Sequence, residues 1–173
     1  MADHEQTRLF VNQPIGKNKT AMESYLALIQ DVPTIQIIAQ AQKEYGLKFL
    51  QQHPEYAQYP VLSAAAPFKS GGRKNDPMSY VEIDAGELCY RHSVDLYSFP
   101  NTVAALKITG AQVKEWLECS ASMFNQIDPD VTEPQYLVNW EGFRTYNFDI
   151  IDGIQYEIDL TEAPKYDRDC ELI

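Results

Sequence analysis

The chain has 173 residues, with 25 acidic and 14 basic side chains and a formal net charge of −11. This length fits one domain with a sizeable core, and the acid excess argues against a binder of duplex DNA or RNA, which needs a basic face. No apolar run approaches the roughly 20 residues of a membrane span. Residues 1–6 lack the features of a signal peptide, which leaves the compartment open.

Three cysteines, Cys89, Cys119 and Cys170, lie far apart and form no CxxC pair and no metal-binding spacing. At most one disulfide is possible among them. We expect buried thiols instead.

The first third of the chain predicts an extended entry and two helices. We expect residues 1–19 to be irregular or extended. A capping-box pattern followed by apolar residues at helical spacing predicts a short helix over 21–30. A second helix follows, with Asp31 as its N-cap and Pro33 in its first turn, and Pro54 closes it.

The rest of the chain predicts strands with one further helix. Apolar runs and alternating patterns indicate strands at 61–65, 81–83, 88–91, 103–108, 136–140 and 144–148. The run at 103–108 is the best candidate for a central strand, and Thr109 after it can cap a helix over 110–124. The dipeptide Asp152-Gly153 predicts a tight hairpin whose second strand follows it. This order of elements predicts an α/β fold (mixed α+β), with mixed sheets flanked by helices.

Side chains for catalysis are sparse. The three histidines, His4, His53 and His92, share no HxH, HxxxH or HExxH motif that would indicate a metal centre. There is no GxSxG motif, and no Ser/His/Asp or Cys/His arrangement stands out. We therefore predict no catalytic and no metal-ligating residue in this chain.

A basic Gly-Gly segment is the candidate anion site. Gly71 and Gly72 let the backbone turn so that N–H groups can face a phosphate or a ribose hydroxyl. Arg73 offers a planar fork of donors, and Lys69 adds positive charge. The alternative is a hairpin tip that binds nothing.

A Phe99-Pro100-Asn101 turn precedes the apolar run 103–108. An aromatic ring held out of the core beside an amide suits a planar, hydrogen-bonding ligand such as a nucleobase. The alternative is that Phe99 is a core residue beside a turn.

Three segments together resemble the C-terminal domain of the 5′-nucleotidase family: residues 62–73, the Phe99-Pro100-Asn101 turn with the strand and helix after it, and residues 139–159. The resemblance covers almost the whole chain. It is closest to the branch of bacterial periplasmic 2′,3′-cyclic-nucleotide 2′-phosphodiesterase/3′-nucleotidases. It implies that residues 1–19 end an interdomain segment and that residues 20–173 form part of a substrate-binding domain, truncated before its second stacking aromatic.

The resemblance also implies a parent enzyme whose separate metallophosphoesterase domain holds divalent metal ions and the catalytic residues. In this chain Phe99 would stack on the base, Asn101 would bond its edge, and Arg73, after Gly71 and Gly72, would contact the ribose or phosphate. Lys69 is a weaker candidate, because the family motif does not fix it. A single ring predicts millimolar or weaker binding of a nucleotide or nucleoside.

On this reading the chain alone is inactive, holds no cofactor, is periplasmic, and has neither nucleic acid nor membrane as a partner. Two alternatives remain open. One is a non-catalytic structural or interaction module of a cell-envelope protein, and the other is a stand-alone hydrolase.

Overall fold

The computed structural model describes residues 2–72, 76–142 and 144–173. Its helices are α1 (Ala2–Val11), α2 (Pro33–Gln51), α3 (Tyr90–Leu96) and α4 (Gly110–Ala121), with short 3-10 helices η1 (Pro54–Tyr56) and η2 (Thr145–Asn147). Its strands are β1 (Pro14–Asn18), β2 (Met22–Glu23), β3 (Ser63–Ala65), β4 (Glu82–Ile83), β5 (Gly86–Cys89) and β6 (Ile150–Asp152). Within the described ranges, no helix is both long and apolar enough to cross a membrane.

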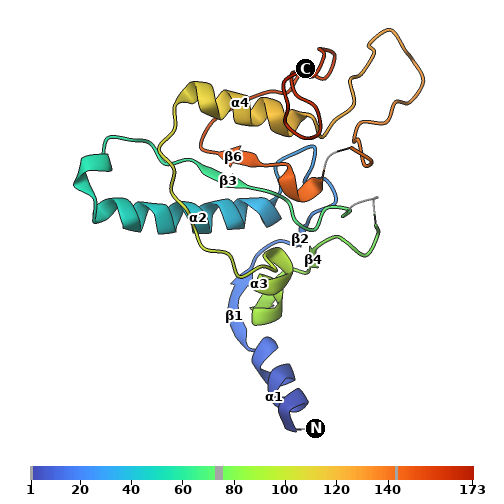
Figure 1. Ribbon diagram of the computed structural model, residues 1–173. Helices are drawn as coiled ribbons and strands as arrows, with labels where there is room; N and C mark the ends of the chain where they lie inside the picture. The colour runs from blue at the N-terminus through green and yellow to red at the C-terminus, as the bar shows by residue number, and fades with distance from the viewer. Residues whose placement is uncertain (1, 73–75, 143) are drawn as a thin grey trace.

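The strands form small antiparallel sheets, in which β1 pairs with β5, β2 with β4, and β3 with β6. In Figure 1 the β3–β6 pair lies between α2 and α4, while α1 and β1 extend from this body as a stalk with the N-terminus at its far end. Buried apolar clusters form around Ile35 of α2, around Met123 and Phe148, and around Ile83 of the β2–β4 pair. The predicted mixed α/β fold with sheets flanked by helices is confirmed, and the sheets are two-stranded.

Two predicted helices are present, although the prediction that Asp31 is the N-cap of the first is wrong. Pro33 begins α2, although the N-cap is Val32 and the Asp31 carboxylate instead accepts from the Gln36 side chain at 2.7 Å. Thr109 caps α4, because its Oγ1 accepts from the Gln112 N–H at 3.3 Å and the Gln112 amide oxygen accepts from the Thr109 N–H at 2.8 Å.

The prediction for the N-terminal segments was wrong. Residues 2–11 form the helix α1 rather than an extended entry, and 21–30 contain β2 and turns rather than a helix. The Ser24 N–H donates to the Val81 carbonyl at 3.2 Å, and the Val81 N–H donates to Ser24 Oγ at 2.9 Å. These bonds to a distant segment satisfy backbone groups that a local helix would otherwise have paired.

The expected central strand at 103–108 was also wrong. In the described chain this segment is an exposed connection without a strand partner, and Leu106 is 71% exposed. An apolar, β-branched composition makes a segment fit for a sheet, but it does not supply the neighbouring strand.

The C-terminal strands differ from expectation as well. Residues 136–140 contribute an isolated bridge between Val138 and Phe124, and 144–148 contain η2. The chain turns at Gly153 but the next residues form no strand, because β6 pairs with β3 instead of with a hairpin partner. The hairpin prediction was therefore wrong.

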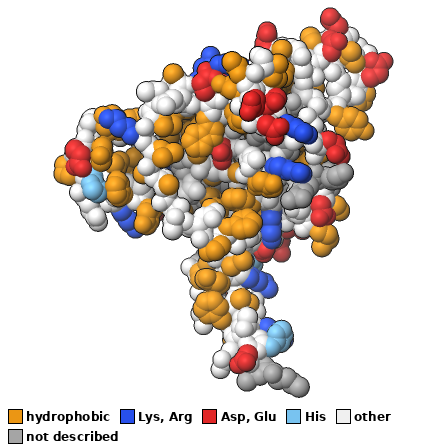
Figure 2. All heavy atoms as spheres, viewed as in Figure 1, with side chains coloured by type: hydrophobic (Ala, Val, Ile, Leu, Met, Phe, Trp, Pro, Cys, Tyr) orange, Lys and Arg blue, Asp and Glu red, His pale blue; other side chains and the backbone are white. Residues whose placement is uncertain are grey.

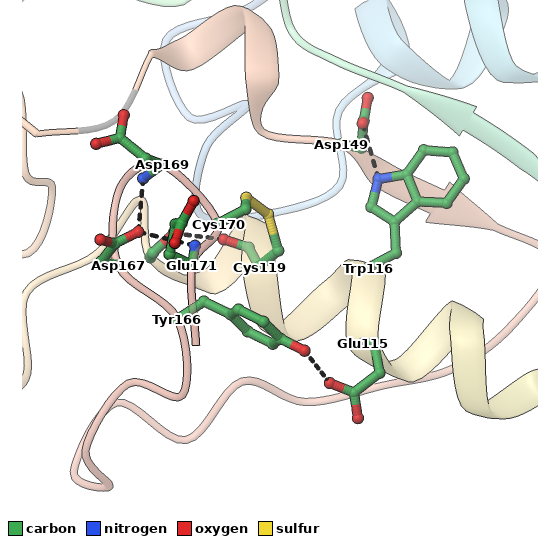
Figure 3. The surroundings of a disulfide bond; sticks show 10 residues. Glu115, Trp116, Cys119, Asp149, Tyr166, Asp167, Asp169, Cys170 and Glu171 are labelled. Carbon is green, nitrogen blue, oxygen red and sulfur yellow. Dashed lines mark hydrogen bonds between the residues drawn. A yellow bond between two sulfur atoms is a disulfide. The ribbon is translucent and has the colours of Figure 1, made fainter. Parts of the chain in front are cut away.

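Cys119 and Cys170 form a disulfide, which overturns the expectation of thiols at these positions, while Cys89 is a buried free thiol as expected. Figure 3 shows that the disulfide joins α4 to the C-terminal segment. Close by, the Glu115 carboxylate accepts from Lys165 Nζ at 2.6 Å and from the Tyr166 hydroxyl. The C-terminal segment is thus attached to α4 by one covalent link and two polar contacts.

Candidate functional site

The turn after α3 presents Phe99 and Asn101 at the surface. The Tyr97 N–H donates to the Ser93 carbonyl at 2.9 Å and ends α3, and the Asn101 N–H donates to the Phe99 carbonyl at 2.9 Å. The Phe99 side chain is 55% exposed. The alternative in which Phe99 is a core residue is therefore wrong, and its ring is accessible to a ligand.

Phe68 links this turn to the segment that contains the Gly-Gly pair. Its ring centroid lies 5.6 Å from that of Phe99 at an interplanar angle of 57°, and 5.0 Å from that of Tyr97 at 89°. Both geometries fall in the range of favourable aromatic pairs. Two segments singled out in the sequence as candidate sites, about thirty residues apart, thus lie side by side.

Sequence reasoning missed two residues here, Phe68 and Tyr97. Besides its edge contact with Phe68, the Tyr97 hydroxyl accepts a hydrogen bond from Asn101 Nδ2 at 3.0 Å. The signal was available, since both aromatics stand within two residues of a predicted site residue.

The Gly-Gly turn depends on glycine. Gly71 has φ +97° and Gly72 has φ +63°, and a Cβ on Gly71 would lie 2.7 Å from the Trp140 ring. The Gly71 N–H donates to the Ser79 carbonyl at 2.8 Å. That donor is therefore already used, so any contribution of Gly71 to ligand binding comes through the shape of the turn.

Lys69 is tied to α3. Its Nζ lies 2.5 Å from Asp95 Oδ1, and both side chains are partly exposed. A phosphate would have to compete with this carboxylate for the ammonium group, which weakens the case for Lys69 as a ligand. Arg73 lies outside the described residues, so its predicted contact stays a prediction.

A separate cavity of about 390 Å³ lies beside the disulfide and includes Trp116, Ser120 and Asp149. Trp116 Nε1 donates to Asp149 Oδ2 at 2.9 Å (Figure 3), and burial raises the pKa of the Asp149 carboxyl above its ordinary value. No set of three or more His, Cys, Asp or Glu side chains that could hold a metal ion occurs in the described ranges.

The family profile described as 5′-nucleotidase, C-terminal domain matches residues 14–168. The chain therefore belongs to the 5′-nucleotidase C-terminal domain family, as the three sequence segments indicated.

The relatives narrow this to one branch of the family. Over 172 residues the chain is 56% identical to a protein of Salmonella typhimurium and 58% identical to one of Yersinia enterocolitica, and over 170 residues it is 59% identical to one of Haemophilus influenzae. All three are named 2′,3′-cyclic-nucleotide 2′-phosphodiesterase/3′-nucleotidase. Each alignment covers 98–99% of this chain but only 26–27% of the relative, so the chain spans about a quarter of their length. No solved structure matches the chain.

Proposed function

We propose that this chain is the nucleotide-recognition domain of a 2′,3′-cyclic-nucleotide 2′-phosphodiesterase/3′-nucleotidase. The observation that carries the proposal is the turn that exposes Phe99 and Asn101 together, with Phe68 beside the ring. The names of the three relatives support the choice of substrate class.

In this proposal the chain binds and orients the substrate. The Phe99 ring stacks on a base, which contributes roughly 1–3 kcal/mol, and Asn101 bonds the base edge. Holding the base fixes where the phosphate lies, and such positioning raises the rate of a reaction that takes place elsewhere. We assign phosphoester hydrolysis, and the divalent metal ions it needs, to a metallophosphoesterase domain of the longer parent.

We also propose a periplasmic location and a role in nucleotide catabolism. The support is the disulfide between Cys119 and Cys170, because disulfides persist in oxidising compartments such as the bacterial periplasm. Small-molecule nucleotides fit the strongly acidic chain better than nucleic acids do, since one phosphate needs only a local cation.

One alternative is a structural or interaction module. Apolar side chains gather on the stalk in Figure 2, where Leu9 and Phe10 of α1 are exposed, and the segment 103–108 is exposed as well. Apolar surface of this kind is typical of contacts with other protein surfaces. This alternative assigns no role in ligand binding to Phe99 and Asn101.

Titration of the isotope-labelled chain with adenosine and 3′-AMP, followed by NMR chemical shifts, tests the proposal. We expect binding in the millimolar range that is lost in Phe99→Ala. The matched control is Tyr136→Ala, which removes an aromatic that is 88% exposed in another part of the chain and should leave binding unchanged.

Absence of any nucleoside effect on the unmodified chain would favour the interaction module. Release of phosphate by the chain without added metal would favour the stand-alone hydrolase. Equal loss of binding in the two variants would mean that Phe99 is not the stacking ring.

A further inference from the structure

The side-chain amide of Asn101 is hydrogen-bonded to Tyr97, a residue outside the Phe99-Pro100-Asn101 motif. Its Nδ2 donates to the Tyr97 hydroxyl at 3.0 Å, and its Oδ1 has no hydrogen-bond partner in the described part of the chain. A side-chain amide carries donors on nitrogen and an acceptor on oxygen, so its orientation decides which of them a ligand meets.

We propose that Tyr97 is a positioning residue that directs the Asn101 carbonyl oxygen toward the ligand, so that the turn selects bases with an exocyclic amino group. The inference rests on the function proposed above and adds a rule of base selection to it. Adenine, cytosine and guanine carry such amino groups, each of which can donate to Oδ1, whereas uracil carries none. A purine without the amino group leaves that oxygen without its bond.

Tyr97 is itself well fixed for this role. Its backbone N–H is bonded to Ser93 at the end of α3, and the edge contact with Phe68 sets its ring. The segment that carries Phe68 is in turn tied to α3 by the ion pair of Lys69 with Asp95. The hydroxyl therefore stands at a defined place relative to the turn, which a flexible surface tyrosine would not provide.

The size of the effect follows from one hydrogen bond. A bond between neutral groups contributes about 1 kcal/mol net, which corresponds to about a fivefold difference in dissociation constant. If the Asn101 amide were free to rotate, it could present either donor or acceptor, and this discrimination would fall.

The experiment compares adenosine with purine riboside, which lacks the 6-amino group, by NMR titration of the full 173-residue chain. We expect adenosine to bind the unmodified chain about fivefold more tightly. Tyr97→Phe keeps the ring against Phe68 and removes only the hydroxyl. It should bring the ratio of the two dissociation constants close to one, with little change for purine riboside. Tyr136→Phe removes a hydroxyl elsewhere and should keep the ratio.

A ratio that is unchanged in Tyr97→Phe overturns the inference, and it leaves the proposed function standing if Phe99→Ala still abolishes binding of both ligands. Tighter binding of purine riboside to the unmodified chain would mean that Asn101 presents Nδ2, which also overturns the inference. If neither ligand binds, the proposed function fails and the inference fails with it.

Discussion

Breaking the disulfide between Cys119 and Cys170 should strongly destabilise the fold. The two cysteines are 51 residues apart in sequence. In the chain-entropy description, a disulfide that closes a loop of this length raises the free energy of unfolding by about 4 kcal/mol. Removing the disulfide should therefore lower the free energy of unfolding by the same amount. This value lies between about 3 kcal/mol for a short loop and almost 5 kcal/mol for a very long one. The contacts of Glu115 with Lys165 and Tyr166 remain in the reduced protein, so the C-terminal segment keeps some local attachment.

Urea denaturation followed by circular dichroism, with and without reductant, measures the effect. For a slope of about 2 kcal/mol per molar urea, the transition midpoint should fall by about 2 M on reduction. The double variant Cys119→Ser with Cys170→Ser should unfold, with or without reductant, at the midpoint of the reduced unmodified protein. It keeps the free thiol Cys89, so it also controls for any effect of reductant on that residue. The reasoning would be refuted by a loss below about 1 kcal/mol, or by an equal effect of reductant on the double variant.

Three further predictions concern single side chains. Gly71→Ala forces a Cβ against the Trp140 ring at positive φ and should lower the free energy of unfolding in urea by about 3 kcal/mol. The control Gly16→Ala has nothing within 4 Å of the new Cβ and should change that free energy by less than about 1 kcal/mol. Similar losses in the two variants would contradict the packing argument. Leu106→Lys should leave stability within about 0.5 kcal/mol, since the side chain is exposed, and a large loss in the same assay would mean that 103–108 is buried after all. Burial raises the pKa of Asp149 above 3.8, so the folded state retains a proton that the unfolded chain has released, and stability falls as pH rises from 3.8 through the folded pKa. Asp149→Asn removes this fall, so its stability relative to the unmodified chain should be more favourable at about pH 7 than at about pH 3.5. A difference that does not vary with pH would contradict the raised pKa.

The elements predicted correctly are those whose signals are local. Pro33 at the start of α2 and the Thr109–Gln112 pair at the start of α4 act within one turn of helix, so the sequence contains both partners of each interaction. Val81 and Ile83 flank an exposed Glu82, and this alternation correctly marked β4 as half-buried.

Two of the elements predicted wrongly depend on partners far away in sequence. Met22 lies opposite Ile83 in the β2–β4 pair, and a helical spacing in 21–30 contains no information about that partner. Ser63 of β3 pairs with Asp152 of β6. The strand partner of β6 is therefore β3, in the first half of the chain, and not the segment that follows the Gly153 turn. A turn signal limits where the chain reverses, but competition among all possible neighbours decides which strands pair.

For the candidate site, the sequence identified the residue types but not the contacts that these residues make. The Phe99-Pro100-Asn101 motif identified the ring and the amide, because their residue types and spacing are local. In our proposal, the contacts that set their roles are the Phe68 edge against Tyr97 and the bond from Asn101 to the Tyr97 hydroxyl. Likewise, the charge of Lys69 was visible in the sequence, but its pairing with Asp95 was not. A motif therefore names the groups that meet a ligand, whereas their donor or acceptor character depends on neighbours that the motif does not include. This is why replacing Tyr97, a residue outside the motif, tests base selection more directly than replacing Asn101 itself.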